Sequence, residues 1–250
     1  EGVLLGDVPQ DAGLSSSAAL EVAVAAAFAA VGQIAWDPVA MARLAQQAEN
    51  GWVGVQCGIM DQLASAAGCG GHALLVDCRS LAIEPVPLPE SARLVVLDTA
   101  TRRGLVDSEY NRRRAQCEAA AAYFDVPSLR DVALERFQEA AQSMDPMTCR
   151  RARHVITENE RTLQAVDAMR RNDPGALGVW MNKSHDSLRE DYEVCNDALN
   201  TMVELARAHE SCFGARMTGA GFGGCAVALA QSETAEALAA DVATAYREQT

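Results

Sequence analysis

Apolar positions along the chain follow two spacings, and these predict an alternation of strands and helices. Short runs rich in Val and Leu predict strands at 3–8, 72–78, 83–88 and 92–99. Apolar positions at helical spacing predict helices at 18–31, 38–51, 57–68, 108–124, 146–171, from 174, from 197 and at 232–248. Residues 215–229 predict a strand, a glycine-rich loop and a second strand. The pattern therefore indicates an α+β fold.

The order of these elements suggests two lobes. Residues 1–91 mix strands with helices, whereas residues 92–250 are rich in helices and are closed by the glycine-rich hairpin. Asp-Pro pairs at 37–38, 145–146 and 173–174 place an N-cap ahead of a proline, which marks three helix starts sharply. The helix at 18–31 is apolar almost throughout, so we expect Leu20 and residues 22–28 to pack into the core.

Composition and charge exclude several classes of protein. The 250 residues are 49% hydrophobic with a formal net charge of -13, and no run of Lys or Arg interleaves with aromatic residues, so a nucleic-acid surface has little support. The most apolar helix is too short to span a bilayer and lacks a basic flank, so we expect no membrane span and no signal peptide. Eight cysteines without a Cys-x-x-Cys pair predict mostly reduced, buried thiols in a cytoplasmic protein.

The stretch QDAGLSSSAALE, residues 10–21, places glycine and three serines directly before the Ala-rich helix. A helix N-terminus offers unpaired N–H donors and a partial positive charge, so Gly13, Ser15, Ser16 and Ser17 are suited to hold a phosphate group. The alternative is a plain serine N-cap. Glu21 stands four residues after Ser17, where a capping box requires three.

Two acids and a second glycine loop are further candidates for chemistry. Asp61 lies at a predicted helix start among Ile, Met and Leu, which favours a general base, although it could equally be an acid that complements the helix dipole. Glu49 precedes it by twelve residues, across a glycine turn. The loop TGAGFGGC, residues 218–225, would let the backbone approach a ligand, or it could be a bare hairpin turn.

Together these segments resemble the GHMP small-molecule kinases and, within them, the galactokinases. The segments that carry this likeness are PQDAGLSSSAALE, GIMDQ, HALLVDCRSL, SEYNRRRAQCE, RARHV, SLREDYEV and RMTGAGFGGC, in that order over nearly the whole chain. The resemblance implies a two-lobed GHMP kinase fold, with a mixed sheet and helices in the first lobe. It also implies transfer of the γ-phosphoryl group of ATP to the C1 hydroxyl of D-galactose.

The same resemblance implies roles for individual residues. A loop would wrap the phosphates of ATP, formed by Asp11, Ala12, Gly13, Leu14, Ser15, Ser16 and Ser17. Ser17 and Glu49 would hold Mg²⁺, and Asp61 would act as the base, or as a charge partner, toward the sugar hydroxyl. The backbone at Gly58 and the side chain of Tyr110 would contact the sugar. We expect a monomer, and we expect Arg112, Arg113 and Arg114 to be solvated.

Two departures from the family pattern affect the expected activity. Asp11 stands where the family loop usually has glycine, and a like charge about 5 Å from a phosphate would cost roughly 3 kcal/mol at an effective dielectric constant near 20. We therefore expect weakened ATP affinity, which Asp11→Gly would restore. The chain also lacks a match to the family's N-terminal sugar-binding segment and to its closing strand, so we expect poor sugar binding and slow or absent turnover.

Several other functions stay open from the sequence. A related kinase could phosphorylate N-acetylgalactosamine, arabinose, mevalonate or homoserine. A non-catalytic sensor of galactose and ATP is another class, although the intact residues Ser15–Ala18 disfavour it. The chain could also be a decayed product that folds poorly.

Overall fold

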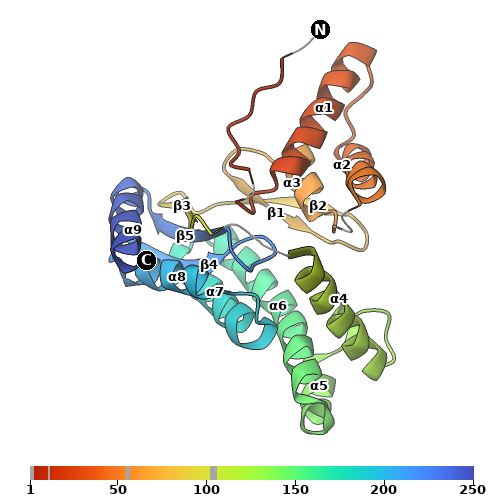
Figure 1. Ribbon diagram of the computed structural model, residues 1–250, viewed down its shortest axis with the longest axis vertical. Helices are drawn as coiled ribbons and strands as arrows, with labels where there is room; N and C mark the ends of the chain where they lie inside the picture. The colour runs from red at the N-terminus through yellow and green to blue at the C-terminus, as the bar shows by residue number, and fades with distance from the viewer. Residues whose placement is uncertain (1–2, 11, 55–56, 102–105) are drawn as a thin grey trace. The chain divides into compact units, whose positions relative to one another are not determined.

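The computed structural model describes residues 3–10, 12–54, 57–101 and 106–250 of the chain. These residues form two compact units, of which the first ends at Leu88 and the second begins at Pro89. Helices and strands occur in both units, as labelled in Figure 1. The α+β class expected from the sequence is confirmed.

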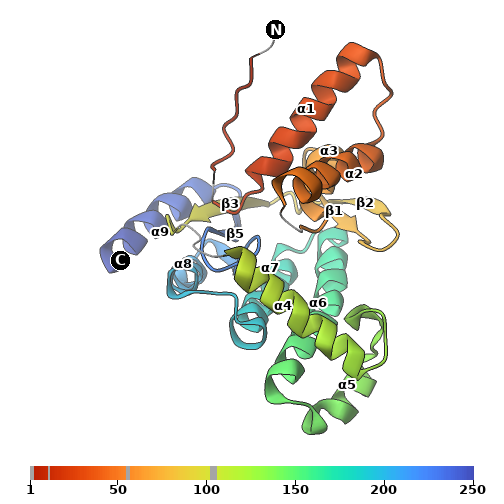
Figure 2. The same ribbon diagram turned by 45° about the vertical axis from the view of Figure 1, so that its right-hand side comes forward.

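The first unit groups three helices with an antiparallel pair of strands. Its elements are α1 (Ser16–Gly32), α2 (Pro38–Ala48), the π-helical turn η1 (Glu49–Val53), α3 (Met60–Ala67), β1 (His72–Val76) and β2 (Ile83–Pro87). The three helices pack against one another (Figures 1 and 2). Asp37 caps α2 as its Asp-Pro pair predicts, because its carboxylate accepts from the N–H groups of Val39 and Ala40. A small core contains Ala42, Ile59 and Leu63.

Two expectations for the first unit are wrong. Residues 3–8 form no strand, since among the described residues no neighbouring strand pairs with them, and an isolated strand leaves its backbone groups unsatisfied by the protein. In α1, Val22 is buried, whereas Leu20 is 45% exposed and Phe28 is 72% exposed. The helix is apolar on every side, but only one side can face α2 and α3, so its composition overstates its burial.

The second unit combines a three-stranded sheet with a set of longer helices. Its elements are β3 (Ala92–Asp98), α4 (Val106–Tyr123), η2 (Leu129–Asp131), α5 (Leu134–Ala140), η3 (Ala141–Ser143), α6 (Pro146–Arg170), α7 (Pro174–Ser187), the π-helical turn η4 (Leu188–Tyr192), α8 (Asp197–Ala208), β4 (Cys212–Met217), β5 (Cys225–Gln231) and α9 (Ala235–Gln249). Asp145, Asp173 and Asn196 cap α6, α7 and α8 with their side chains.

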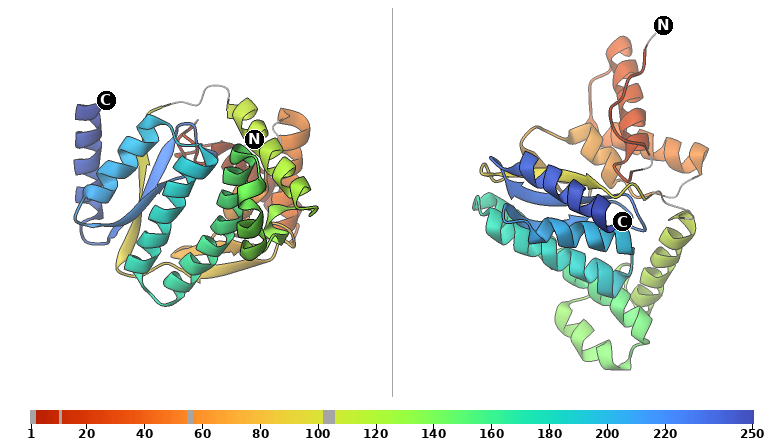
Figure 3. Two further views of the ribbon diagram at one scale, coloured as in Figure 1. Left: turned by 90° about the horizontal axis from the view of Figure 1, so that it is seen from below. Right: turned by 60° about the vertical axis from the view of Figure 1, so that its left-hand side comes forward.

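The sheet has the order β3-β5-β4 and is antiparallel throughout. Alternate residues of β5, Ala226, Ala228 and Ala230, share one buried cluster with α8 and α9, as expected where successive side chains of a strand point to opposite faces. Figure 3 shows these helices running along the sheet. Helix α7 approaches β4 so closely that a Cβ at Gly178 would lie 2.1 Å from the carbonyl oxygen of Phe213.

The eight cysteines are free thiols, but their burial varies. Cys149 and Cys225 are buried, whereas Cys69 and Cys78 are exposed, which contradicts the expectation of burial for the last two. In the described part of the chain, no helix has the length and the apolar character that crossing a membrane requires.

Candidate functional site

The start of α1 presents backbone donors that no serine hydroxyl caps. Ser15 occupies the N-cap position in the left-handed conformation, with φ 55°, and its side chain makes no capping hydrogen bond. Gly13 also has a positive φ, of 75°, and Ala12 is fully buried beside it. The first helical bond runs from the Ala19 N–H to the Ser15 carbonyl at 3.0 Å. A helix start of this kind suits an anion. Asp11 lies outside the described residues.

Two carboxyl groups meet inside the first unit. Glu49, the first residue of η1, is only 7% exposed, and its Oε2 has no hydrogen-bond partner among the described residues. Burial raises the pKa of Glu21 to about 7, with further contributions from a hydrogen bond and charge repulsion with Glu49. The carboxyl of Glu21 on α1 is therefore in contact with that of Glu49 at the end of α2.

Polar side chains hold the segment that precedes α3 against this pair. Gln62, 2% exposed, donates through Nε2 to Glu21 Oε2 at 3.5 Å, and the same nitrogen lies 3.7 Å from Cys57 Sγ. Asn50 Oδ1 accepts from the backbone N–H of Cys57 at 3.1 Å. Gln46 Nε2 donates to the Cys57 carbonyl at 3.1 Å. The segment that leads into α3 is thus fixed by side chains from α2, η1 and α3 itself.

The two predicted residues next to this segment have surroundings that suit a ligand. Gly58 is exposed, and a Cβ placed on it would meet no atom within 4 Å. Asp61 lies in the first turn of α3, as the sequence predicts, and its side chain is partly buried. Ile59 and Leu63 on either side of it are buried, so core packing fixes the helix that carries the acid.

The residues of the first unit fit a hard divalent cation. Among the described residues, no cluster of three or more His, Cys, Asp or Glu side chains could hold a metal alone. Mg²⁺, however, usually takes one or two carboxylates and completes its shell with water and phosphate oxygens. The unpartnered, buried Glu49 Oε2 is the kind of oxygen that such an ion requires.

In the second unit, the structure corrects one of three predicted solvated arginines. Arg112 and Arg114 are exposed, but the Arg113 side chain is only 9% exposed. It donates to the carbonyls of Tyr192 and Glu193, both at 2.7 Å. Three consecutive helical residues point 100° apart, so they cannot all face solvent on a packed helix. Tyr110, one turn earlier on α4, is 39% exposed.

The glycine-rich loop of residues 218–224 is tied down on both sides. The Phe222 N–H donates to the Val194 carbonyl at 2.7 Å, and the Gly224 N–H donates to the Thr101 carbonyl at 3.0 Å. Gly221 has φ 86°, and a Cβ there would lie 2.4 Å from the Val194 carbonyl oxygen. Arg113 also sits 5.6 Å from the centre of the Phe222 ring. This loop has one fixed conformation rather than that of an adaptable hairpin turn.

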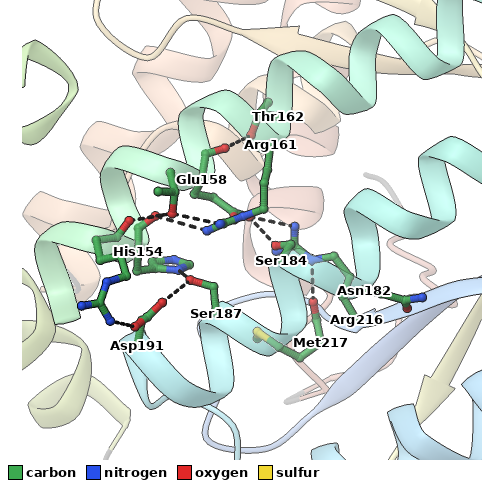
Figure 4. Close-up of polar contacts among 12 residues, drawn as sticks. His154, Glu158, Arg161, Thr162, Asn182, Ser184, Ser187, Asp191, Arg216 and Met217 are labelled. Carbon is green, nitrogen blue, oxygen red and sulfur yellow. Dashed lines mark hydrogen bonds and ion pairs between the residues drawn. The ribbon is translucent and has the colours of Figure 1, made fainter. Parts of the chain in front are cut away.

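A polar network between α6, α7 and β4 supports the strand that precedes this loop (Figure 4). Glu158 accepts from Ser184, from Arg161 Nε at 2.6 Å and from Arg216 Nη1 at 3.3 Å. Ser187 donates to Asp191 Oδ2 at 3.0 Å, and its hydroxyl oxygen lies 3.0 Å from His154 Nδ1. Because serine lies between histidine and acid, the order does not suit a catalytic triad, and the network is structural.

Glu21 is the member of the site that the sequence argument missed. It was considered only as a failed capping-box residue. It stands four positions after Ser17, and this spacing places the two side chains on one helix face. That spacing, taken with the nearby Glu49 and Gln62 contacts, is the signal that could have identified it.

Comparisons with known proteins show the family to which the chain belongs. The family model for the GHMP kinases N terminal domain matches residues 3–69, and the model GHMP kinases C terminal matches residues 165–248. The chain carries both domains and belongs to the GHMP kinases, a family of phosphotransferases.

Solved structures of this family resemble the chain to different degrees. Galactokinase from Lactococcus lactis, in complex with galactose, is 35% identical with a TM-score of 0.91; the match covers 97% of this chain and 64% of that one. Mevalonate kinase from L. major is 22% identical, with a TM-score of 0.62 over 92% of this chain and 61% of that one. Homoserine kinase from Cytophaga hutchinsonii is 17% identical, with a TM-score of 0.61 over 98% and 64%. The last two share the fold alone. The chain thus spans less than two thirds of the length of each.

Proposed function

We propose that this chain is the body of an ATP-dependent sugar kinase that phosphorylates the C1 hydroxyl of D-galactose. The observation that carries the proposal is the 35% identity to a galactokinase, spread over 97% of the chain at a TM-score of 0.91. The arrangement of the first unit supports it, since an uncapped helix start, a buried carboxylate and a helix-borne Asp61 occur in one compact unit.

Phosphoryl transfer needs positioning and charge neutralisation more than covalent chemistry. The start of α1, from Ala12 to Ser17, would hold the phosphates through backbone N–H groups and the dipole of the helix. Asp61 would accept the proton of the C1 hydroxyl, or hold that hydroxyl in line, as it attacks the γ-phosphorus. The backbone at Gly58, where an added Cβ would meet no atom within 4 Å, would contact the sugar, and the sugar contact expected of Tyr110 stays a prediction.

Magnesium fits this proposal through the oxygen ligands already described. Ser17 and Glu49 would hold the ion, and it would neutralise charge on the phosphate oxygens when bound. Asp11 lies next to these groups in the sequence, and the weakening of ATP affinity that we expect from its charge stays a prediction.

The test is turnover of Mg-ATP with D-galactose, measured in a coupled assay beside Asp61→Ala and with isothermal calorimetry for both ligands. We expect ATP to bind both proteins, and we expect any galactose-dependent turnover to disappear in Asp61→Ala. Absence of ATP binding to the folded wild-type chain would contradict the proposal.

A panel of acceptors separates the related activities. N-acetylgalactosamine, arabinose, mevalonate and homoserine are tested beside galactose, and preferred phosphorylation of any of them would redirect the assignment within the family. Binding of both galactose and ATP without turnover, unchanged by any Asp61 substitution, would favour a sensor.

A further inference from the structure

Two buried polar atoms in the first unit lack a partner, and they lie in the same cluster. They are Oε2 of Glu49 and Oε1 of Gln62, on side chains that are 7% and 2% exposed. Buried polar groups are nearly always hydrogen-bonded, so each such exception calls for an explanation. Gln62 already donates to Glu21, and Glu21 is in contact with Glu49, so both orphan atoms belong to one group of side chains.

The position of Glu21 on α1 relates this cluster to the start of the helix. Ser17 and Glu21 are four residues apart, so they lie on one face and about 6 Å apart along the axis. Helical side chains lean toward the N-terminus, which favours a position of the Glu21 carboxyl near the turn that carries Ser17. An ion held by this carboxyl is therefore close to phosphates bound at the start of α1.

Two carboxylates in contact repel each other, and the described residues around them contribute no cation. Gln62 is neutral, and no salt bridge of the described residues involves Glu21 or Glu49. Either a shared proton or a divalent cation must relieve this repulsion. A shared proton satisfies one oxygen of the pair, whereas a cation with several coordination positions also gives the buried Glu49 Oε2 a partner.

We propose that Glu21 is a second carboxylate ligand, beside Glu49, of the divalent cation that accompanies the nucleotide, and that Gln62 positions it. This inference rests on the proposed phosphoryl-transfer function. It adds a residue that none of the comparisons assigns and makes the cation site a pair of carboxylates completed by hydroxyl, water and phosphate oxygens.

The test uses Mn²⁺ as the probe and measures binding, not turnover. Electron paramagnetic resonance follows free Mn²⁺ during titration of the 250-residue protein with ADP present, for wild type, Glu21→Gln and Glu49→Gln. We expect each variant to weaken Mn²⁺ binding roughly tenfold or more, because each removes a charged ligand. The matched control is Glu84→Gln, an exposed carboxylate on β2, which should stay within about twofold of wild type.

The Glu21→Gln result separates ligation from a purely structural role. Glutamine keeps the shape and the donor of a protonated glutamate, so a neutral Glu21 that merely bonds to Glu49 would be replaced without loss of Mn²⁺ affinity. Affinity within twofold of wild type in folded Glu21→Gln, with Glu49→Gln impaired, would overturn the inference. If Glu21→Gln does not fold, Glu21→Asp provides the test. Its carboxylate is one methylene shorter, so we expect both the affinity for Mn²⁺ and the spectrum of bound Mn²⁺ to change. If neither changes, the inference is overturned.

The same titration distinguishes the two proposals. If the wild-type protein binds neither ADP nor Mn²⁺ with ADP, the proposed function itself fails. If wild type binds both and Glu21→Gln binds them equally, only the role of Glu21 fails.

Discussion

The loop before α1 and the loop between β4 and β5 both place residues at positive φ, but they differ in how they are held. Residues 218–224 bond to Val194 on one side and to Thr101 on the other, and Gly221 leaves no space for a side chain. At the start of α1, by contrast, the side chain of Ser15 makes no capping bond to the first turn. The second loop is bonded on both sides within the protein, whereas the first is the loop that we propose binds phosphate.

The polar groups in the two units are also arranged differently. In the second unit, Arg113 and Arg151 bond to the turn at 191–193, and through Val194 this turn supports residues 218–224. In the first unit, Glu49 and Gln62 keep orphan atoms. Among the described residues, buried atoms without a partner also occur in the second unit, at Arg150 Nε, His185 Nε2, Asn200 Oδ1 and Thr234 Oγ1. The first unit differs in that its two orphan atoms belong to side chains that both contact Glu21.

The largest effect is expected from breaking the completed network at Arg151. This side chain is 2% exposed and donates to Gln116, to the Asp191 carbonyl and to Glu193 Oε2. Arg151→Met should lower the free energy of unfolding by about 4 kcal/mol, because it removes three hydrogen bonds made by a buried, charged guanidinium. The free energy of unfolding of the second unit is measured by denaturation, followed by the fluorescence of Trp180 in a protein with Trp36 and Trp52 replaced by Phe.

The matched control for that variant is Arg150→Met. Arg150 contacts the same Glu193 carboxylate at 3.2 Å but is 39% exposed, so its loss should cost no more than about 1 kcal/mol. Equal losses of unfolding free energy in Arg151→Met and Arg150→Met would show that the burial of an arginine does not determine how much it stabilises the fold.

Gly221→Ala should have the next largest effect. The new Cβ would lie 2.4 Å from the Val194 carbonyl oxygen, and alanine is strained at φ 86°. We expect a loss of roughly 3 kcal/mol in the Trp180 assay. Gly175→Ala, in the first turn of α7, where the nearest atom is at 3.5 Å, should be neutral or slightly stabilising. A neutral Gly221→Ala would mean that the loop can move, and would remove the contrast between the two loops.

The second unit should lose stability in mild acid through two buried histidines. Burial lowers the pKa of His154 to about 4 and that of His185 to about 4, from an ordinary value of 6.5. Between pH 6.5 and 4 the unfolded chain binds protons that the folded chain does not, so the stability present above pH 6.5 falls as the pH falls. From pH 7 to pH 5 each histidine should remove about 2 kcal/mol.

Denaturation of the second unit at a series of pH values measures this loss. His154→Gln and His185→Gln should each reduce the loss of stability between pH 7 and pH 5 by about 2 kcal/mol, the contribution of one histidine. A decline that neither substitution changes would show that other groups cause it.

Helix caps give the smallest effects and test the first unit directly. Asp37→Ala removes an acceptor of the Val39 and Ala40 N–H groups and should cost about 1 kcal/mol. Ser15→Ala removes a hydroxyl that caps nothing, so it should cost less than about 0.5 kcal/mol. Unfolding of the first unit is followed by the fluorescence of Trp36, with Trp52 and Trp180 replaced by Phe. Trp36 is a suitable probe because its ring nitrogen donates to the Ala66 carbonyl at 3.1 Å in the folded unit. If Ser15→Ala lowered the free energy of unfolding as much as Asp37→Ala does, the conclusion that the Ser15 side chain does not cap α1 would be wrong.

The sequence predicted elements best where local chemistry decides them. The Asp-Pro pairs located α2, α6 and α7 to the residue, because the cap and the proline act within one turn. Predictions that depend on distant partners were weaker. The strand at 3–8 needed a neighbour, and the burial of Arg113 depends on the turn at 191–193, some eighty residues away. For the site, the sequence suggested Asp61 and Glu49, whose roles stay predictions, but it could not suggest Glu21, because the proposed role of Glu21 depends on contacts between helices.

The π-helical turn η1 makes the site depend on chain length as well as on side-chain chemistry. A π turn contains one residue more than an α-helical turn, and in this unit it begins at Glu49, directly after α2. Removing one residue there would let α2 continue in α-helical phase and would rotate everything beyond it by about 100°. Glu49 would keep its place, but Cys57, Gly58 and Asp61 would lose their register with it. Descendants of this sequence should therefore tolerate replacement within Glu49–Val53 far better than insertion or deletion.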